Sequence, residues 1–473
     1  MSVSTKIQAA AVKQLYSYLD KDPEQNIPKL MEKLAALDKE GGIAGQLKTI
    51  AKNISDPEGN WFKFLTSLWN DINPHQRRVL VDSAVINASI IGNPMAIKLQ
   101  EKYDCNIPWA ILMDPTSACN LRCTGCWAAE YGHQMNLSLE ELDNIIHQGN
   151  ELGTYVYLYS GGEPTTRKKD LIALCDRHPD CAFLFFTNGT LIDDEFADEM
   201  LRVGNLVPAI SIEGFEETTD ARRGAGTYKK VLEAMERLKA RKLLFGISCC
   251  YTSLNTDTIG SEEYFDTMID MGAKFAWFFT YMPIGADAVP ELMVSARQRK
   301  FMYDQIQKFR KTKPIFTIDF WNDGDAVGGC VAGGRGYLHI NANGDIEPCA
   351  FIHYSDSNIR EKTLLEAYRS PLFQAYRKGQ PFNDNMLRPC PVLDNPKALI
   401  QIVDSSHAKS TDMLNPELAC DYCGRCVKVS EEWGLVADEI WKNKANKKGV
   451  QTTGRMAKKS YEFLTGSVPA DKF

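Results

Sequence analysis

The sequence lacks long apolar runs and an excess of positive charge. No stretch approaches the roughly 18 uninterrupted apolar residues of a membrane span, and the N-terminus, MSVSTKIQAAAVKQLYSYLDKD, lacks the basic-then-apolar order of an export signal. Lys and Arg number 54 against 61 Asp and Glu, which gives a formal net charge of -7. This balance offers no basic surface for phosphate backbones, so a nucleic-acid partner is not expected. We predict a soluble, cytoplasmic protein without a transmembrane segment.

The chain is long enough for several hydrophobic cores and is rich in cysteine. With 473 residues, 44% of them hydrophobic, it is expected to hold two or three domains. Its 14 cysteines indicate metal binding rather than disulfides, because thiols stay reduced in the cytoplasm. Nine of them fall in two groups, within 119–126 and 330–426. The remaining five are interpreted as small buried side chains: Cys105, Cys175, Cys181, Cys249 and Cys250.

The first group lies in the stretch TSACNLRCTGCWAAE, directly after a strand-like run over 109–113. Cys119, Cys123 and Cys126 have the spacing C-x3-C-x2-C, and three thiolates this close can hold three corners of an iron-sulfur cube. The fourth iron then has no protein ligand in the motif and can bind a small molecule. A zinc knot is the alternative, but zinc sites usually present four ligands in two pairs, and this motif supplies three.

This cysteine spacing resembles that of the radical SAM superfamily. The resemblance implies that Cys119, Cys123 and Cys126 hold a [4Fe-4S] cluster whose open iron chelates S-adenosylmethionine. It also implies reductive cleavage of that cofactor to a 5'-deoxyadenosyl radical, which takes hydrogen from an unactivated carbon. Trp127, the residue after the third cysteine, is expected to shield the cluster from solvent.

Residues 109–285 alternate between strand-like and helix-like segments, which predicts an α/β fold with a parallel sheet. Ligands gather at the carboxyl ends of such strands, and the three cysteines follow the first strand. The resemblance implies a partial (β/α)6 barrel over 109–290, between a helical N-terminal region (1–108) and a cysteine-rich region (314–473). Pro208 would remove a ladder bond, so the fourth strand is expected to begin after Leu206. The expected strands are 109–113, 155–159, 182–186, 206–212, 243–250 and 275–281.

A second motif, Gly161, Gly162 and Glu163, stands at the end of the second expected strand. Two glycines let a ligand approach the backbone, and a carboxylate can accept hydrogen bonds from an ammonium group. An ordinary strand-to-helix turn is the alternative. The motif resembles the superfamily's GGE sequence, which implies contact with the methionyl amino group of S-adenosylmethionine.

The resemblance also implies that Ser211 and Arg223 hold the ribose and the carboxylate of the cofactor, with Glu213 as a weaker candidate. A solvated acidic loop is the alternative, since further acids crowd there. Residues 187–189, Thr-Asn-Gly, resemble the superfamily without indicating a role. The glycine-rich fifth-strand motif of the superfamily is missing, because 245–252 reads FGISCCYT.

The second cysteine group begins with Cys330, followed by Gly344 and Cys349 in the spacing C-x13-G-x4-C. Asn343-Gly344 predicts a hairpin turn. This opening resembles the SPASM or twitch extension of radical SAM enzymes, which implies at least one auxiliary [4Fe-4S] cluster. Cys390 is either a further ligand or a bystander, and a zinc ribbon is the alternative for the whole set. The remaining cysteines form a tighter triplet than the extension usually has: Cys420, Cys423 and Cys426.

The resemblance therefore implies a radical SAM enzyme that draws electrons from a reductant such as flavodoxin or ferredoxin. By analogy with enzymes that carry SPASM-like extensions, the substrate is expected to be a peptide or protein. The aromatic N-terminal stretch 61–69 supports an alternative, in which an apolar substrate such as a lipid chain is joined or functionalised. A non-catalytic iron-sulfur or zinc scaffold is a third hypothesis. A long apolar tunnel leading to the cluster would favour the lipid.

Overall fold

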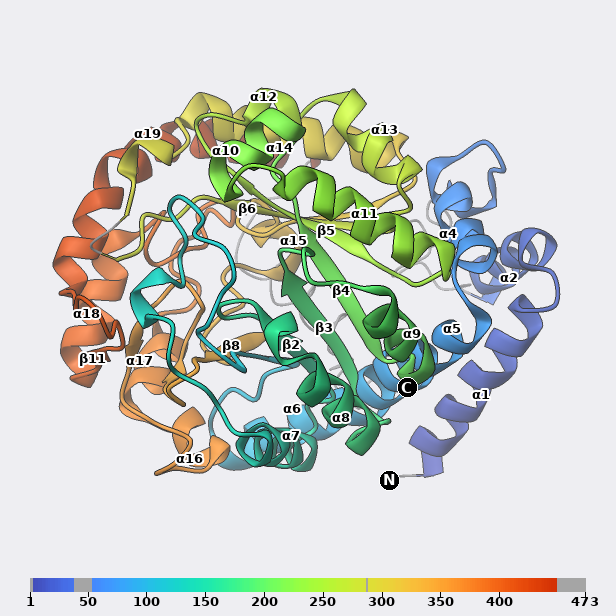
Figure 1. Cartoon of the computed structure of the whole chain (residues 1–473), viewed down its shortest axis with the longest axis horizontal. Coiled ribbons are helices and arrows are strands. Elements are labelled where there is room, and N and C mark those ends of the chain that lie inside the picture. Colours follow the sequence, from blue (N-terminus) through green and yellow to red (C-terminus); the bar gives the residue numbers. More distant parts are fainter. Residues whose placement is uncertain (1–2, 38–52, 286–287, 449–473) are drawn as a thin grey trace.

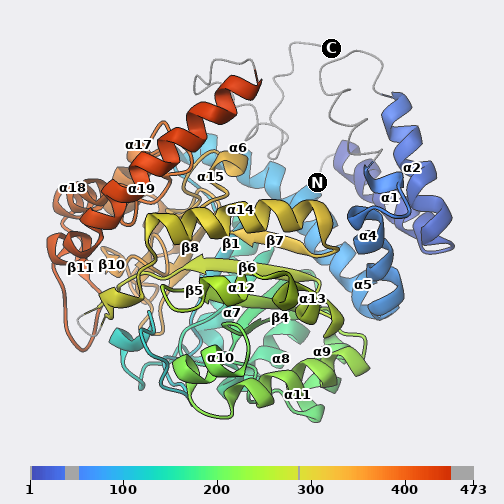
Figure 2. The same ribbon diagram turned by 90° about the horizontal axis from the view of Figure 1, so that it is seen from above.

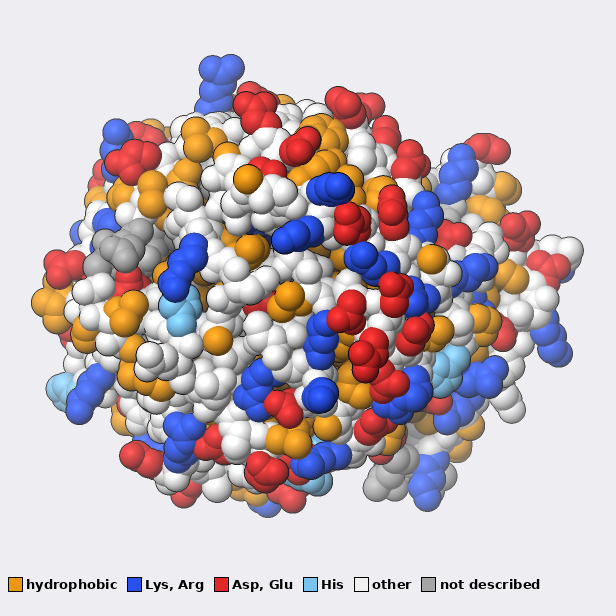
Figure 3. Space-filling model, in the orientation of Figure 1, with side chains coloured by type: hydrophobic (Ala, Val, Ile, Leu, Met, Phe, Trp, Pro, Cys, Tyr) orange, Lys and Arg blue, Asp and Glu red, His pale blue; other side chains and the backbone are white. Residues whose placement is uncertain are grey.

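The structure, a computed structural model, describes residues 3–37, 53–285 and 288–448. A strongly curved sheet forms its centre and helices cover the outer face of that sheet (Figure 1). Acidic and basic side chains lie interspersed over the face seen in Figure 3, as expected for a chain with nearly balanced charge. The last part of the expected third region, 449–473, lies outside the described residues.

The described part of the N-terminal region, 3–37 and 53–103, is largely helical, as predicted. Both views place α1, α2, α4 and α5 at the opposite end of the molecule from α17, α18 and α19 (Figures 1 and 2). Its elements are α1 (Val3–Leu19), α2 (Pro23–Leu37), α4 (Asn60–Asp71), α5 (Pro74–Leu80), η1 (Val81–Gly92) and α6 (Asn93–Tyr103).

The last three of these elements form one continuous helix, Pro74–Tyr103. By length and composition alone this helix could cross a membrane, and 28% of its most apolar window is buried. Polar residues such as Asp82 and Asn87 interrupt it, which is why the sequence shows no uninterrupted apolar run. Ala84 and Ala88 pack against the central sheet, so part of this helix belongs to the protein core.

The six predicted parallel strands are confirmed and run side by side in chain order. Each pairs in parallel with its neighbour, which requires the helical crossovers that the sequence pattern predicts. The strands are β1 (Ala110–Met113), β2 (Val156–Tyr159), β3 (Ala182–Thr187), β4 (Leu206–Ser211), β5 (Gly246–Tyr251) and β6 (Phe275–Thr280).

The expectation that Pro208 delays the fourth strand is wrong. β4 begins at Leu206 and contains Pro208, whose register partner on β3 is Phe185. The ladder between β4 and β5 begins only at Ala209, so Pro208 has a strand partner on one side. A proline is tolerated at such a position because the missing N–H interrupts no pairing on the open side.

Three further strands extend the sheet at its two ends. β7 (Phe316–Asp319) pairs with β6 in parallel, and β8 (Tyr337–Ile340) pairs in parallel with the free edge of β1. β9 (Ile346–Glu347) returns antiparallel to β8, which confirms the predicted hairpin, and Gly344 in its turn has φ +85°. The strand order is β7-β6-β5-β4-β3-β2-β1-β8-β9, so the cysteine-rich region completes the sheet of the barrel.

The crossover helices follow the predicted signals. Ser138 and Glu141 form the predicted capping box ahead of α7 (Leu139–Leu152), and Gly153 ends this helix at φ +94°. The other helices of the barrel are η3 (Pro164–Arg167), α8 (Lys168–Arg177), α9 (Asp194–Val203), α10 (Glu216–Arg223), α11 (Thr227–Ala240), α12 (Thr256–Ile259), α13 (Glu262–Asp270) and α14 (Ala296–Thr312).

The cysteine-rich region is largely irregular or helical outside the hairpin. β10 (Tyr354–Ser355) and β11 (Lys409–Ser410) form a separate pair. Its helices are α15 (Gly324–Val327), α16 (Leu364–Tyr368), α17 (Pro371–Gly379), α18 (Pro396–Ser406) and α19 (Ala419–Lys448). Two short 3-10 turns complete the chain, η2 (Ala129–Tyr131) and η4 (Pro290–Leu292).

Alternate residues of the central strands face two different cores, as the period of two in a strand requires. On β2, Tyr157 and Tyr159 belong to the large core beneath the helices, whereas Val156 and Leu158 belong to a smaller cluster inside the curved sheet. Ala88 of η1 joins this inner cluster. The inner face of the sheet is therefore apolar along much of its length.

Candidate functional site

A cavity of about 470 Å³ occupies the inside of the curved sheet. It reaches from Trp109 and Ala110, at the beginning of β1, to Cys119, Cys123 and Cys126 beyond the end of this strand. The predicted cofactor residues Gly161, Gly162, Glu163, Ser211 and Arg223 also line it. The structure thus brings together all eight candidates for the radical cluster and its cofactor.

The two glycines of the GGE motif pack against the backbone that leads into the cysteine loop. A Cβ at Gly162 would lie 2.1 Å from the carbonyl oxygen of Ala118, and one at Gly161 would lie 2.5 Å from that of Thr116. Gly162 N–H donates to Thr116 (2.9 Å) and Glu163 N–H to Ala118 (2.8 Å). The sequence predicts that these glycines leave room for a ligand. In the structure they are also required because the backbone of the cysteine loop passes close to them.

Glu163 is buried and its carboxylate accepts four hydrogen bonds. The donors are Thr165 N–H (3.0 Å), Thr165 Oγ1 (2.5 Å), Thr187 Oγ1 (2.7 Å) and Asn188 N–H (2.7 Å). Burial raises the pKa of Glu163, although these donors oppose the shift. The same carboxyl group lines the cavity, so it combines a structural role with a surface that a cofactor can contact.

Residues 187–189, whose role the sequence left open, brace the cysteine loop. Asn188 donates to Asn120 (2.8 Å), which in turn donates to Thr190 (2.9 Å). Asn120 lies next to Cys119 in the chain. The end of β3 therefore holds both the carboxylate of the GGE motif and the loop that carries the first cysteine.

Arg223 forms a buried ion pair with Glu213, and Arg222 donates to the same carboxylate (2.9 Å). Burial alone would raise the pKa of Glu213, but the two guanidinium groups hold it below its usual value. Arg223 Nη1 also lies 3.9 Å from Cys123 Sγ. Arg223, which is predicted to bind the carboxylate of the cofactor, is thus already paired with Glu213. Its remaining nitrogen, Nη1, faces the cysteine loop.

The donor set fits an iron-sulfur cluster better than a solvated loop. Three thiols converge on one cavity, and burial raises the pKa of Cys119 to about 11 in the absence of metal. Burial also raises the pKa of Cys123, although the neighbouring Arg223 guanidinium opposes this shift. A guanidinium beside the sulfurs suits thiolates that carry the charge of a bound cluster.

Trp127 lies where the sequence predicts, on the wall of the cavity beside Cys126. Its ring meets those of His339, Phe351 and His353 edge-on, at centroid distances of 5.6, 5.9 and 6.1 Å. These contacts fix the indole between the cysteine loop and the cysteine-rich region.

A buried polar network beneath Trp127 was not predicted from the sequence. His339 bridges Asp114 (3.0 Å) and Glu347 (2.6 Å), and Tyr131 donates to Glu347 (2.8 Å). Burial alone would lower the pKa of His339, but the two carboxylates raise it to about 10. The network joins β1, the cysteine loop and the β8–β9 hairpin. Its members are far apart in sequence, so no local pattern could reveal it.

Cys250 was interpreted as a buried bystander, but its side chain lines the cavity. Cys249, its neighbour on β5, is fully buried in the outer core. Adjacent residues of a strand face opposite sides, so one of the pair had to face inward. Strand alternation was therefore the signal that could have identified Cys250 as a residue of the site.

Three cysteines of the second group, Cys330, Cys349 and Cys390, line a small cavity of about 40 Å³. Tyr376 Oη lies 3.2 Å from Cys330 Sγ, and Tyr337 Oη lies 2.7 Å from Cys349 Sγ. Cys390 accepts hydrogen bonds from the backbone N–H groups of residues 392 and 393. Sulfurs held by such donors are suited to carry a cluster.

Cys390 also lies close to two cysteines of α19. Burial raises the pKa of Cys423 to about 12, and the neighbouring Cys390 thiol contributes to this shift and to that of Cys426. Cys330 and Cys390 likewise act on Cys349. Cys420 is exposed, whereas Cys423 and Cys426 are buried. Cys330, Cys349 and Cys390 therefore line one cavity, and Cys390 is close enough to Cys423 and Cys426 to affect their pKa values.

Comparison with known families gives two matches. The model of the Radical SAM superfamily matches residues 113–267, which run from the last residue of β1 into α13 and include the three cysteines of the loop. The model of an iron-sulfur cluster-binding domain, SPASM, matches residues 330–392 and so includes Cys330, Cys349 and Cys390. The triplet on α19 lies beyond this match.

Two distant curated relatives are matched over most of their own length. An AdoMet-dependent heme synthase of Methanosarcina barkeri is 23% identical over 67% of this chain and 97% of its own. Mycofactocin maturase MftC of Mycobacterium ulcerans is 27% identical over 59% of this chain and 80% of its own. Streptococcus suis SuiB, solved with its precursor peptide SuiA, matches 69% of this chain and 79% of its own with a TM-score of 0.53. At 18% identity, SuiB shows a shared fold.

Proposed function

Since the chain belongs to the radical SAM superfamily and carries a SPASM domain, we propose that it removes hydrogen from an unactivated carbon of an apolar substrate, such as a lipid chain. It is an enzyme whose cofactors are S-adenosylmethionine, a radical-generating [4Fe-4S] cluster and an auxiliary [4Fe-4S] cluster in the SPASM domain. When bound, the radical cluster supplies reductive cleavage of S-adenosylmethionine to a 5'-deoxyadenosyl radical. A one-electron donor of the flavodoxin or ferredoxin class would supply the electron, and the cytoplasm is the proposed location.

The polar end of the cavity would hold the cofactors. Cys119, Cys123 and Cys126 would ligate the radical cluster, and the GGE carboxylate would accept from the methionyl amino group. Ser211, at the end of β4, would meet the ribose, and Arg223 would face the carboxylate with the nitrogen that Glu213 leaves free. The auxiliary cluster would be held by ligands drawn from Cys330, Cys349, Cys390, Cys423 and Cys426, with exposed Cys420 less favoured.

The apolar end of the same cavity supports an apolar substrate rather than a peptide. Below the cysteines, the wall consists of aliphatic and aromatic side chains that point inward from the strands. A peptide backbone placed there would leave N–H and C=O groups without partners, at a cost of several kcal/mol for each unsatisfied group. An alkyl chain gains about 0.8 kcal/mol for each buried CH₂. The residues of this wall include Trp109, Leu112, Val156, Leu158, Leu184, Phe186, Trp277, Phe279 and Phe351.

A peptide or protein substrate remains the second candidate. It is supported by the similarity to MftC, a maturase by name. The heme synthase, which is 23% identical over a longer span, is by its name not a peptide maturase, so related chains also act on other substrates. A peptide would approach the polar end of the cavity from outside and leave the apolar end unused.

Deuterium transfer separates the two candidates. The reconstituted, reduced enzyme is given S-adenosylmethionine with either a perdeuterated membrane-lipid extract or a perdeuterated peptide digest, and deuterium in 5'-deoxyadenosine is quantified. We expect label from the lipid fraction alone. Label from the peptide fraction alone would overturn the proposal in favour of the second candidate. The variant with all three loop cysteines changed to Ala should give no 5'-deoxyadenosine.

A matched pair of substitutions tests the apolar wall. Leu158→Trp fills the cavity from β2, whereas Leu254→Trp adds the same side chain at a position that is 76% exposed. We expect Leu158→Trp to keep cleavage of S-adenosylmethionine but to lose deuterium transfer, while Leu254→Trp behaves like the wild type. Full transfer by Leu158→Trp would show that the substrate does not use this part of the cavity.

A further inference from the structure

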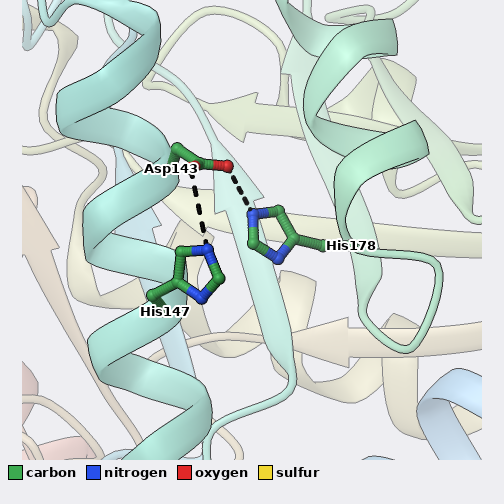
Figure 4. A group of neighbouring side chains, drawn as sticks. All are labelled: Asp143, His147 and His178. Atoms are coloured by element: carbon green, nitrogen blue, oxygen red, sulfur yellow. Dashed lines mark hydrogen bonds and ion pairs between the residues drawn. The ribbon is translucent and has the colours of Figure 1, made fainter.

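A second cluster of metal-binding side chains lies outside the cavity, on the outer helices of the barrel (Figure 4). Asp143 and His147 are four residues apart on α7, so they share one face of this helix. His178 is the residue that ends α8. One carboxylate oxygen and one nitrogen of each imidazole all lie within 4.8 Å of one another.

The individual distances suit a shared cation. His178 Nε2 lies 2.8 Å from Asp143 Oδ1, and His147 Nε2 lies 3.7 Å from Asp143 Oδ2. Tetrahedral zinc with ligand bonds of about 2.0–2.2 Å places its ligands about 3.3–3.6 Å apart. This spacing is longer than the first distance, which is a hydrogen bond, and slightly shorter than the second, which ends at the other carboxylate oxygen. Small rotations of the three side chains would therefore bring them to the spacing of zinc ligands.

The two histidines of the cluster differ in burial, so His178 is held in place and His147 is free to adjust. The side chain of His178 is 4% exposed and that of His147 is 67% exposed. The two rings meet edge-on with centroids 5.0 Å apart. A buried ligand is held in place before the ion arrives, and the open side next to His147 leaves a coordination position for water.

The electrostatics of the cluster admit a cation. His178 Nε2 is hydrogen-bonded to Asp143 Oδ1, and a cation bound between them would replace the proton that they share. Arg177 Nη1 lies 3.6 Å from Asp143 Oδ1 and competes for the same carboxylate. Its side chain is 44% exposed and can turn away into solvent when a divalent ion binds.

We propose that Asp143, His147 and His178 form a zinc(II) site that ties α7 to the end of α8. Two imidazoles and one carboxylate are ligands that zinc prefers, with water in the fourth position. The two helices flank β2 and β3, the strands that present the GGE motif and its partners. The ion would act as a brace on the outer layer of the barrel, away from the residues that line the cavity.

Zinc binding by the cluster-loaded enzyme tests this site without any measurement of turnover. Zn²⁺ is titrated against a competing chromophoric chelator for the wild type and for His147→Ala, which removes an exposed ligand and should not disturb folding. His407→Asn, which changes another exposed histidine, at the end of α18, is the matched control. We expect one more bound equivalent in the wild type and the control than in His147→Ala. Equal stoichiometry in all three proteins would overturn the proposal.

Two further readouts identify the ligands. Co²⁺ in place of Zn²⁺ should give visible absorption bands in the wild type that are absent from His147→Ala and from Asp143→Asn. Zn²⁺ should also raise the melting temperature of the wild type but not that of His147→Ala, because a ligand stabilises only a state that binds it. The same shift in both proteins would place the ion elsewhere and contradict the assignment.

Discussion

At the scale of the residue, Glu163 combines a proposed role in cofactor binding with hydrogen bonds that stabilise the site. Its carboxylate accepts from two backbone N–H groups and two hydroxyls, so every hydrogen-bonding partner named for it is a donor. In Glu163→Gln, an NH₂ group replaces one acceptor and faces a donor. We expect the free energy of unfolding to fall by about 1–3 kcal/mol. Cleavage of S-adenosylmethionine should fall as well.

Denaturant midpoints and 5'-deoxyadenosine yields of Glu163→Gln measure these two effects. Glu216→Gln on α10 is the control, because Glu216 is exposed and should tolerate the change within about 0.5 kcal/mol. Equal midpoints for both variants would show that the hydrogen bonds to Glu163 contribute no net stability.

Gly162 illustrates a different constraint at the same scale. An added Cβ would meet the Ala118 carbonyl at 2.1 Å, so Gly162→Ala must displace the backbone that leads to Cys119. We expect a loss of about 1–3 kcal/mol in stability and incomplete loading of the radical cluster. Gly424→Ala is the contrasting variant, because nothing lies within 4 Å of its added Cβ on α19. Iron content and unfolding midpoints compare the two, and full iron loading of Gly162→Ala would contradict the packing argument.

At the scale of the element, the junction of β8 with β1 predicts how stability depends on pH. The pKa of His339 is about 10 in the folded protein, above its ordinary value of about 6.5. Because the folded state binds this proton more tightly, the stabilisation is fully present below about pH 6.5 and is lost as the pH rises towards 10. For one proton, the free energy of unfolding falls by at most about 1.4 kcal/mol per pH unit.

Unfolding midpoints of the wild type and His339→Asn between pH 7 and 9.5 check this dependence. Buried thiols also bind protons more tightly in the folded state and act in the same direction, so the difference between the two proteins is the relevant quantity. We expect a shallower decline for His339→Asn and an unchanged decline for the control His407→Asn. Parallel curves for the wild type and His339→Asn would contradict the assignment of this proton to His339.

The elements also show what the sequence could predict. Alternating apolar runs and the capping box at Ser138 predict six strands and α7 because these signals are local. Pro208 led to a wrong start for β4 because the sequence does not show where the neighbouring strand β5 begins to pair. A proline breaks a strand only where its missing N–H would be paired. The turn at Gly344 predicts the hairpin. The pairing of its strand β8 with β1 joins residues more than 200 positions apart, and no local pattern encodes this contact.

At the scale of the whole molecule, the cysteine-rich region collects sulfurs from three separate segments. Cys390 lines one cavity with Cys330 and Cys349 and also raises the pKa values of Cys423 and Cys426 on α19. We therefore expect Cys390→Ala to lose auxiliary iron, whereas Cys420→Ala, at an exposed position, should retain it. Iron and sulfide per chain, measured with the three loop cysteines also changed to Ala, isolate the auxiliary content. Equal loss in both variants would show that Cys420 is also a ligand.

The candidate site was predictable where ligands cluster in sequence and unpredictable where the fold brings them together. Cys119, Cys123 and Cys126 are recognised by spacing alone, and the GGE motif by its place after a strand. The pairing of Arg223 with Glu213 and the position of Cys250 on the wall depend on strand register. The apolar interior, on which the proposed lipid substrate rests, consists mostly of residues at ordinary strand positions.

The pairing of β8 with β1 also has a consequence for synthesis on the ribosome. Until residues 337–340 have emerged, the strand that precedes the cysteine loop has a partner on one edge only. Asp114, at its end, then has no His339 to neutralise it. Iron delivered to a nascent chain would meet three thiols on an incomplete support. We therefore expect the radical cluster to be inserted fully only after residues 337–340 have been synthesised and paired with β1.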